Sequence, residues 1–316
     1  MRILFLHLSD LHIENELGLN LPRVQSLVQS LQGFDHVDGI VIAISGDLAR
    51  NGKRDEYRLV SLFMDCLLMK ITDSYALDSK DIKILLIPGN HDIDWGDSRS
   101  INPASIRQLS NLGLHSAYQT ELEKMDSFFW YSNKHGCFNM SRFQREENQV
   151  FTRKILHFSS GYRIEANLIN TAPFSCENDD GLHYLPPTAL YEFSKPSNAD
   201  LALVMMHHSP DWFPFDMKKQ ICQSINERCS LAFYGHDHVP GSEVISLQES
   251  IKLFEETLVK GDCLLAVALF HLVEDKLAPG KVNGNIAEFF IIDKTLYASP
   301  LCLFPLFFLF CRKFSF

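Results

Sequence analysis

The sequence has no pair of cysteines close enough to form a C-x-x-C motif, although it contains eight cysteines. The two that lie nearest in the chain are Cys222 and Cys229. Scattered cysteines of this kind favour free thiols in a reducing compartment over a disulfide framework. We therefore expect a cytoplasmic protein whose cysteines take no part in its chemistry.

Long hydrophobic runs are also absent. A transmembrane helix needs about 20 apolar residues, whereas the most apolar stretch, residues 301–311, is shorter and contains Pro305. The N-terminal run Ile3–Leu8 is too short for a signal peptide and leads into Asp10 without a cleavage site. Neither a membrane span nor export is predicted. For this apolar end we expect either a buried C-terminal strand or a chain that is truncated or frame-shifted before a further domain or partner. We favour truncation, because an exposed apolar end promotes aggregation.

Basic residues are in deficit. The chain has 29 Lys and Arg against 39 Asp and Glu, a formal net charge of −10. Surfaces that bind nucleic acid broadly are usually basic, so this balance disfavours such a partner. The sequence shows no repeats or low-complexity tracts, and its apolar fraction of 46% is that of an ordinary globular protein with a sizeable core.

Five short apolar runs each end in a polar block. Runs of four to eight apolar residues bounded by Gly or Pro predict strands that are buried on both faces. Apolar residues at helical spacing predict helices around 24–31 and 59–68, which gives a βαβαβ beginning. Open α/β sheets place their ligands at the carboxyl ends of the strands, so we expect the polar blocks to converge. The five runs are Ile3–Leu8, Ile40–Ile44, Ile82–Ile87, Leu201–Met206 and Leu231–Tyr234.

The polar blocks combine carboxylates, imidazoles and one amide. This mixture suits Mn, Fe, Zn or Co better than Ca or Mg. Each residue alone would more often be a turn residue, a helix cap or a buried histidine, but their occurrence together and in this order predicts a two-metal phosphoesterase site. The blocks are Asp10-Leu11-His12, Gly46-Asp47, Gly89-Asn90-His91-Asp92, His207-His208 and Gly235-His236-Asp237-His238.

In these motifs the sequence resembles the calcineurin-like metallophosphoesterases over residues 1–240. The resemblance implies a four-layer α/β/β/α sandwich with an inserted helical segment, and two divalent ions such as manganese, iron or zinc. It also implies that a hydroxide between the ions attacks phosphorus and that His91 gives a proton to the leaving oxygen. The implied ligands are Asp10, His12 and His238 for one ion, Asn90, His207 and His236 for the other, and Asp47 for both. Asp92 and Asp237 are expected to be turn or supporting carboxylates.

The residues after Asp47 indicate a branch of this family. Gly46 to Gly52, followed by Glu56-Tyr57, resembles the G-D-L-x-x-x-G-x-x-x-E-Y stretch of the cyclic-nucleotide and glycerophosphodiester phosphodiesterases. The D-R-G and G-N-H-E motifs of protein Ser/Thr phosphatases are absent, and Arg50 stands where purple acid phosphatases carry a metal-binding Tyr.

Other side chains are candidates for contact with the substrate. Arg50 and Arg54 either contact a substrate phosphate or are simply solvated. His208 is either a substrate-side group or a side chain that packs behind the ligands.

Two regions lie outside the motifs. Residues 95–150 are a predicted insertion, either a lid beside the cleft or a helical pair whose aromatics, Phe128 to Tyr131, form core. Residues 241–316 are a predicted C-terminal extension, with a helix over 244–258 and a strand or strand pair over 289–296.

The resemblance implies an enzyme that hydrolyses phosphate mono- or diesters of small or nucleotide-like substrates. Two alternatives remain. A nuclease of the recombination type shares this site but needs basic grooves and a DNA-capping domain, which the sequence does not show. A non-catalytic interaction scaffold usually lacks the catalytic histidine or a ligand, whereas here His91 and all seven ligands are present.

Overall fold

The structure is a computed structural model that describes most of residues 2–236. The described ranges are 2–14, 37–96, 103–106, 108–109, 111–138, 149–176 and 182–236, together with residues 24, 25, 27, 28 and 31. Beyond residue 236 it describes four strands, within 241–292. Predicted features at His238, Asp237 and residues 301–316 lie outside the described residues.

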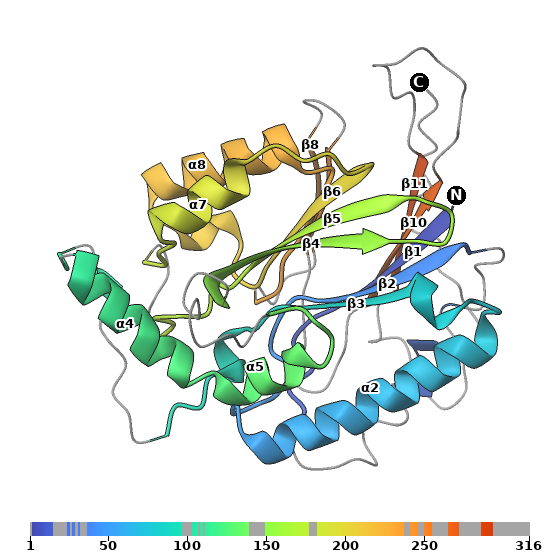
Figure 1. Cartoon of the computed structure of the whole chain (residues 1–316), viewed down its shortest axis with the longest axis horizontal. Helices are drawn as coiled ribbons and strands as arrows, with labels where there is room; N and C mark the ends of the chain where they lie inside the picture. The colour runs from blue at the N-terminus through green and yellow to red at the C-terminus, as the bar shows by residue number, and fades with distance from the viewer. Residues whose placement is uncertain are drawn as a thin grey trace.

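Two β-sheets form the centre of the molecule (Figure 1). The first has the strand order β11-β10-β1-β2-β3, and the second has the order β4-β5-β6-β7-β9-β8. The rings of Phe5 in β1 and Phe233 in β7 stack across the two sheets with centroids 5.8 Å apart. The strands of the first sheet are β1 (Arg2–Leu8), β2 (Gly39–Ile44), β3 (Ile82–Leu86), β10 (Leu265–His271) and β11 (Ile286–Ile292). Those of the second are β4 (Phe151–His157), β5 (Arg163–Ile169), β6 (Leu201–Met206), β7 (Leu231–Phe233), β8 (Gly241–Ile245) and β9 (Ser250–Phe254).

All five predicted strands are confirmed, as β1, β2, β3, β6 and β7. Strands such as β2 and β6 are buried at every residue, because the opposite sheet covers one face and helices cover the other (Figure 1), whereas β3 is fully buried only at its last two residues. The parallel register aligns their carboxyl ends: Leu8 is opposite Ile44, and Ile44 is opposite Leu86. The polar blocks of these three strands therefore start from one row at the edge of the sheet.

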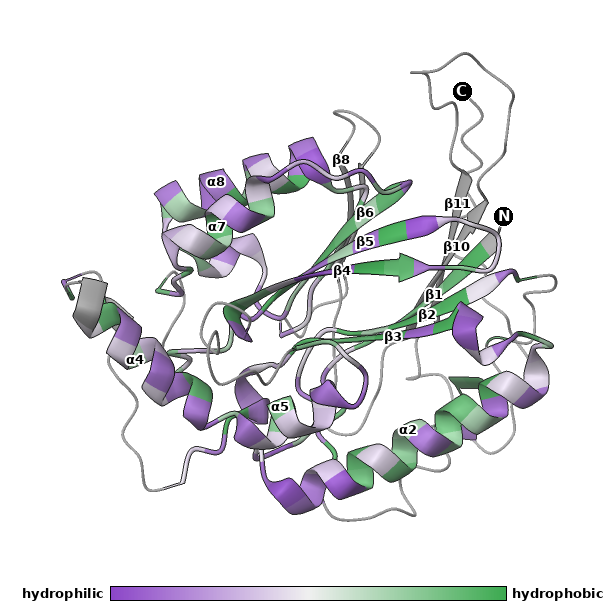
Figure 2. Ribbon diagram, viewed as in Figure 1, coloured by the Kyte–Doolittle hydropathy of each residue, from purple (hydrophilic) through white to green (hydrophobic). Residues whose placement is uncertain are grey.

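Helices cover the outer faces of the two sheets, which confirms the predicted four-layer sandwich (Figure 1). Helix α2 (Arg54–Ser74) lies on the first sheet, and helices α7 (Pro187–Ser194) and α8 (Phe215–Arg228) lie on the second. The core-facing side of α2 buries five apolar residues at the predicted helical spacing: Val60, Phe63, Met64, Leu67 and Ile71. Hydrophobic residues dominate strands such as β2 and β6, whereas α8 is largely hydrophilic (Figure 2).

The described residues of the segment after the third strand include helices α3 (Pro103–Ile106), α4 (Asn111–Glu123) and α5 (Asp126–Asn133). Phe128, Phe129 and Tyr131 of α5 are buried, and the ring of Tyr57 in α2 lies 5.6 Å from that of Tyr131. Three of the four aromatics thus form core, as the helical-pair alternative expected, whereas Trp130 is only partly buried. The role of this segment as an inserted lid and the boundaries of residues 1–240, 95–150 and 241–316 stay predictions.

The predicted helix over 244–258 is wrong, because the chain forms the antiparallel pair β8 and β9 there. Ile251 and Leu253 alternate with period two, and β9 extends the second sheet by pairing in parallel with β7. A local apolar pattern cannot anticipate this non-local pairing. The strand predicted near 289–296 is present as β11, which begins three residues before the predicted start. Within the described part of the chain, no helix is long and apolar enough to cross a bilayer.

Candidate metal centre

The loops that follow the strands hold several predicted ligands in an unusual backbone conformation. Asp10, His12, Asp47 and His236 have φ of 53°, 44°, 54° and 73°. A non-glycine residue in this left-handed region costs on the order of 1–3 kcal/mol and persists only where its surroundings enforce it. Here the Asp10 N–H donates to Gly46 O (3.1 Å) and the His12 N–H to Asp47 O (2.9 Å). The two loops therefore fix each other, as is typical of functional sites.

Asp47 lies between the two predicted sets of ligands. Its Oδ1 accepts a hydrogen bond from the His91 backbone N–H (2.8 Å). Its Oδ2 is 3.9 Å from His12 Nε2 and 3.5 Å from His207 Nε2, which are imidazoles from the two different sets. Burial, followed by the nearby charge of Asp10, raises the pKa of Asp47 well above its usual range. A cation beside this carboxylate would therefore relieve an unfavourable buried charge.

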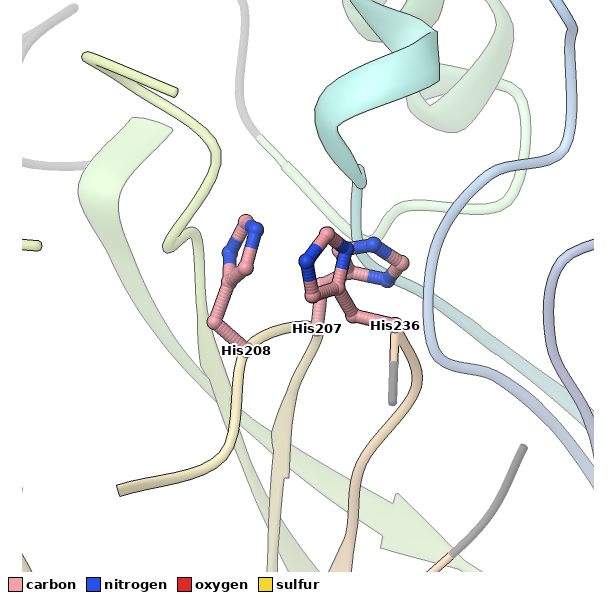
Figure 3. Close-up of side chains that lie close together, drawn as sticks. All are labelled: His207, His208 and His236. Carbon is pink, nitrogen blue, oxygen red and sulfur yellow. The ribbon is translucent and has the colours of Figure 1, made fainter. Parts of the chain in front are cut away.

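Three side chains of one predicted set converge on a single point. Asn90 Oδ1 is 3.0 Å from His207 Nε2 and 2.9 Å from His236 Nδ1. His207 Nδ1 donates to Ser45 O (2.7 Å), so Nε2 of the neutral ring carries a lone pair toward Asn90. Two ligands of one ion with bonds of about 2.0–2.1 Å lie about 2.9–3.4 Å apart. The spacing of these donors therefore fits a divalent cation, and Figure 3 shows the rings of His207 and His236 side by side.

The other predicted set is described in part. Asp10 is buried, and its Oδ2 lies 3.4 Å from the His236 backbone N–H. Burial, then the nearby His91, lowers the pKa of His12 to about 3, which keeps the imidazole neutral as metal binding requires. His12 Nδ1 is buried and has no hydrogen-bond partner among the described residues. His238, the third predicted ligand of this set, lies outside them.

His91 is held beside Asp47 and His12. Its Nδ1 donates to the carbonyl oxygen of Arg50 (2.9 Å), which leaves Nε2 for another partner. Its ring meets that of His12 edge-on, with centroids 4.4 Å apart. Nitrogens of His12 and His91 and an oxygen of Asp47 all lie within 4.8 Å of one another. The geometry thus permits either a proton-donor or a ligand role for His91.

Asp92 fixes the backbone beneath the site. Its carboxylate accepts hydrogen bonds from the backbone N–H of Gly89 (2.9 Å), Ala49 (2.9 Å) and Leu48 (3.3 Å) and from Tyr57 Oη (2.6 Å). It therefore ties the loop of Asp47 to the loop of Asn90, in keeping with a supporting role. A Cβ at Gly89 would lie 2.1 Å from Asp47 Oδ1, so only glycine allows this close approach.

The two predicted substrate arginines lie at the rim. Arg50 is about half exposed, and its Nε is 3.6 Å from Glu14 Oε2. The guanidinium of Arg54 stacks on the Trp130 ring of α5 at 3.4 Å from its centroid. The structure thus pairs each arginine with a neighbour in the protein, and their contact with a substrate stays a prediction.

His208 is buried beside the converging set, in contact with residues that the sequence did not reveal. Its ring lies 3.9 Å from that of His183, and the Trp212 ring lies 4.4 Å from that of His236. Thr171 contacts His208 through its hydroxyl. One signal for Thr171 exists in the sequence, because the apolar pair Leu168-Ile169 before it is also followed by a polar pair, Asn170-Thr171. The sequence around His183 carries no comparable signal.

Comparison with known proteins bears on the family. The family described as calcineurin-like phosphoesterase matches residues 3–240. Comparison with curated proteins gave no match. Among solved structures, phosphopantetheinyl hydrolase of Mycobacterium tuberculosis is similar with 12% identity and a TM-score of 0.42, over 80% of this chain and 88% of that one. GAP50, the anchor in the inner membrane complex of Plasmodium, is similar with 13% identity and a TM-score of 0.41, over 92% and 88%.

Structural similarity at this level carries no argument about activity. The family match, however, extends over well more than half of the chain and includes every predicted ligand. Members of this family hydrolyse phosphoesters and bind divalent metals, and the described residues include His and Asp groups able to hold them. The chain belongs to the calcineurin-like phosphoesterase family.

Proposed function

We propose that the chain is a binuclear metal-dependent phosphoesterase that hydrolyses small or nucleotide-like phosphate mono- or diesters. The observation that carries this proposal is the position of Asp47 Oδ2, 3.9 Å from His12 Nε2 and 3.5 Å from His207 Nε2. A carboxylate oxygen between two sets of ligands is what a pair of cations needs, since it reduces their mutual repulsion.

The ligands of the two ions come from both sheets. Asn90, His207 and His236 would hold one ion, and Asp10, His12 and His238 the other, with Asp47 shared. When bound, manganese, iron or zinc ions would polarise the phosphoryl oxygens and lower the pKa of a bound water toward neutrality, which supplies the nucleophile. The hydrogen bond from His207 Nδ1 to Ser45 O orients that ring toward the site.

His91 is proposed as the proton donor to the leaving oxygen. The bond from its Nδ1 to Arg50 O fixes the ring, so a proton on Nε2 is the one available for transfer. A departing alkoxide needs such a proton, and general acid catalysis contributes about 10²- to 10⁴-fold.

The resemblance to the cyclic-nucleotide and glycerophosphodiester phosphodiesterases supports a diester substrate. In this chain Glu56 and Tyr57 of that stretch hold the neighbouring loop in place through hydrogen bonds. Glu56 accepts hydrogen bonds from the backbone N–H groups of Asn51 (3.0 Å) and Lys53 (3.1 Å), and Tyr57 donates to Asp92. They stabilise the loop after Asp47, which places Arg50 at the rim. The branch is thus proposed from the sequence of this loop.

A metal-reconstituted activity screen tests the proposal. The substrates are bis-p-nitrophenyl phosphate, p-nitrophenyl phosphate, cyclic nucleotides and single-stranded DNA, each with Mn²⁺, Fe²⁺ or Zn²⁺ and with a chelator control. We expect hydrolysis of the small diesters that disappears on chelation. Turnover confined to single-stranded DNA would instead support the nuclease alternative, and no turnover with any metal would support a scaffold.

A further inference from the structure

His208 has a buried ring nitrogen that the proposed mechanism does not use. The residue follows His207 directly at the end of β6 and has no exposed surface. Its ring stands beside those of His207 and His236 (Figure 3). One nitrogen from each of these three histidines lies within 4.8 Å of the others. Distance alone would therefore allow His208 to be a further metal ligand.

Thr171 decides which nitrogen of His208 carries the proton. Thr171 Oγ1 accepts a hydrogen bond from the His208 backbone N–H (3.0 Å) and also lies 3.0 Å from His208 Nδ1. The Thr171 hydroxyl has a single hydrogen to donate. Among the described residues, the acceptor within reach of this hydrogen is His208 Nδ1. If Nδ1 were the donor, this buried hydroxyl would keep an unsatisfied hydrogen. If the hydroxyl is the donor, the unsatisfied hydrogen is on Nε2 instead, where a bound oxyanion can accept it, so a bound anion favours donation from the Thr171 hydroxyl to Nδ1.

This arrangement makes Nε2 of the neutral ring a hydrogen-bond donor. An imidazole with its lone pair on Nδ1 carries its hydrogen on Nε2. His208 Nε2 is buried and has no hydrogen-bond partner among the described residues. A nitrogen that carries hydrogen has no lone pair for a cation, so His208 differs from its neighbour His207, whose Nδ1 donates and whose Nε2 accepts.

The ring of His208 is also fixed in orientation. It stacks on His183 with an interplanar angle of 31° and a centroid distance of 3.9 Å. His183 Nδ1 donates to the carbonyl oxygen of Thr171 (3.0 Å), so Thr171 positions both rings. The Trp212 ring lies 5.8 Å from that of His208 and 6.1 Å from that of His183, so it packs beside both rings. A donor held this firmly costs little reorganisation when it meets a ligand.

We infer that His208 Nε2–H donates a hydrogen bond to a non-bridging oxygen of the phosphoryl group, and that Thr171 is the positioning residue for this donor. The inference rests on the proposed function. A nitrogen of His208 lies within 4.8 Å of a nitrogen of each of His207 and His236, so a phosphoryl oxygen on an ion held by these two would come within reach of a hydrogen bond from His208. The ligand class is a tetrahedral phosphate oxyanion.

Variants of His208 with different reach test the inference. The amide nitrogen of His208→Gln comes close to the position of Nε2, whereas that of His208→Asn comes close to Nδ1, and His208→Leu has no donor. The readouts are metal content, the affinity for inorganic phosphate by calorimetry on manganese-loaded protein, and kcat and KM for bis-p-nitrophenyl phosphate. We expect His208→Leu to keep its metals but lose about 10²- to 10³-fold in kcat and to bind phosphate more weakly. His208→Gln should recover a large part of both losses, and His208→Asn little.

Thr171 provides a second, independent pair of variants. Thr171→Val removes the hydroxyl at nearly constant volume and should move kcat and phosphate affinity in the same direction as His208→Leu, by less. Thr171→Ser should recover most of what Thr171→Val loses. Three results would overturn the inference. They are normal kcat and phosphate affinity in His208→Leu, equal kcat and phosphate affinity in His208→Gln and His208→Asn, and loss of an ion from both His208→Leu and His208→Gln.

Failure of the proposed function gives a different result. In that case the wild-type protein would hydrolyse none of the esters, while the calorimetric comparison of phosphate affinity would still decide the role of His208.

Discussion

At the scale of single residues, the site depends on side chains in which one polar atom is hydrogen-bonded to the protein and another faces the site. One oxygen of Asp47 is held by the His91 backbone N–H, and the other faces His12 and His207. One nitrogen of His91 is held by Arg50 O. This division leaves one atom of each side chain for chemistry while the other fixes its orientation, which is the preorganisation that catalysis requires.

A substitution at His91 separates proton donation from metal binding. His91→Ala should keep both metals and slow turnover by about 10²- to 10⁴-fold. The loss should be smaller for p-nitrophenyl esters than for alkyl esters, because p-nitrophenolate needs little protonation to leave. Metal content and kcat for the two kinds of ester measure the effect, and His115→Ala on the exposed surface of α4 is the matched control. An equal loss for both esters would argue against the acid role, and loss of an ion would make His91 a ligand.

At the scale of elements, helix α2 supports the site from below. Tyr57 donates to Asp92, which in turn holds the loops of Asp47 and Asn90. The ring of Tyr57 also packs against Tyr131 of α5 at 5.6 Å. The helix thus connects the aromatic core of residues 126–133 to the strand ends that carry the ligands.

Two buried tyrosines in contact should respond differently to the loss of a hydroxyl. Tyr57→Phe removes a donor to a buried carboxylate and should lower the free energy of unfolding by about 1.5–3 kcal/mol. The Tyr131 hydroxyl is buried and has no hydrogen-bond partner among the described residues, so Tyr131→Phe should be neutral or stabilising. Urea unfolding of the two variants measures the difference. Equal destabilisation would show that the bond to Asp92 is not what holds these loops.

The sequence predicts the elements that local pattern determines and misses those that depend on distant contacts. The strand before Asp10 and the strand before His207 are apolar runs followed by polar residues, so their ends are visible in the sequence. The pair β8 and β9 is not, because pairing with β7 determines it. The contact between Thr171 and His208 joins residues 37 positions apart and follows from the parallel pairing of β5 with β6.

At the scale of the whole molecule, the site joins the two sheets. The first sheet contributes Asp10, His12, Asp47 and Asn90, and the second contributes His207 and His236. The protein around them is acidic, with a net charge of −10. Positive charge would therefore come mainly from the ions, which suits a small anionic ester better than a long polyanion.

The charge of the whole chain predicts weak binding to nucleic acid. Metal-free protein should show no measurable affinity for DNA near physiological salt. A protein that tracks the backbone would show log–log salt slopes of about −0.7 to −0.9 per neutralised phosphate. Fluorescence anisotropy with single-stranded and duplex DNA checks this expectation. A submicromolar Kd under those conditions would favour the nuclease alternative.

The most direct test of the central claim, two ions that share Asp47, is to count metals in the wild-type protein and in Asp47→Asn. Elemental analysis after reconstitution should find two ions per wild-type chain. In the variant the neutral amide cannot balance both cations, so occupancy of both positions should fall and activity should drop by several orders of magnitude. Circular dichroism should show that the fold is kept. Two ions per chain in Asp47→Asn, together with near-normal turnover, would contradict the account.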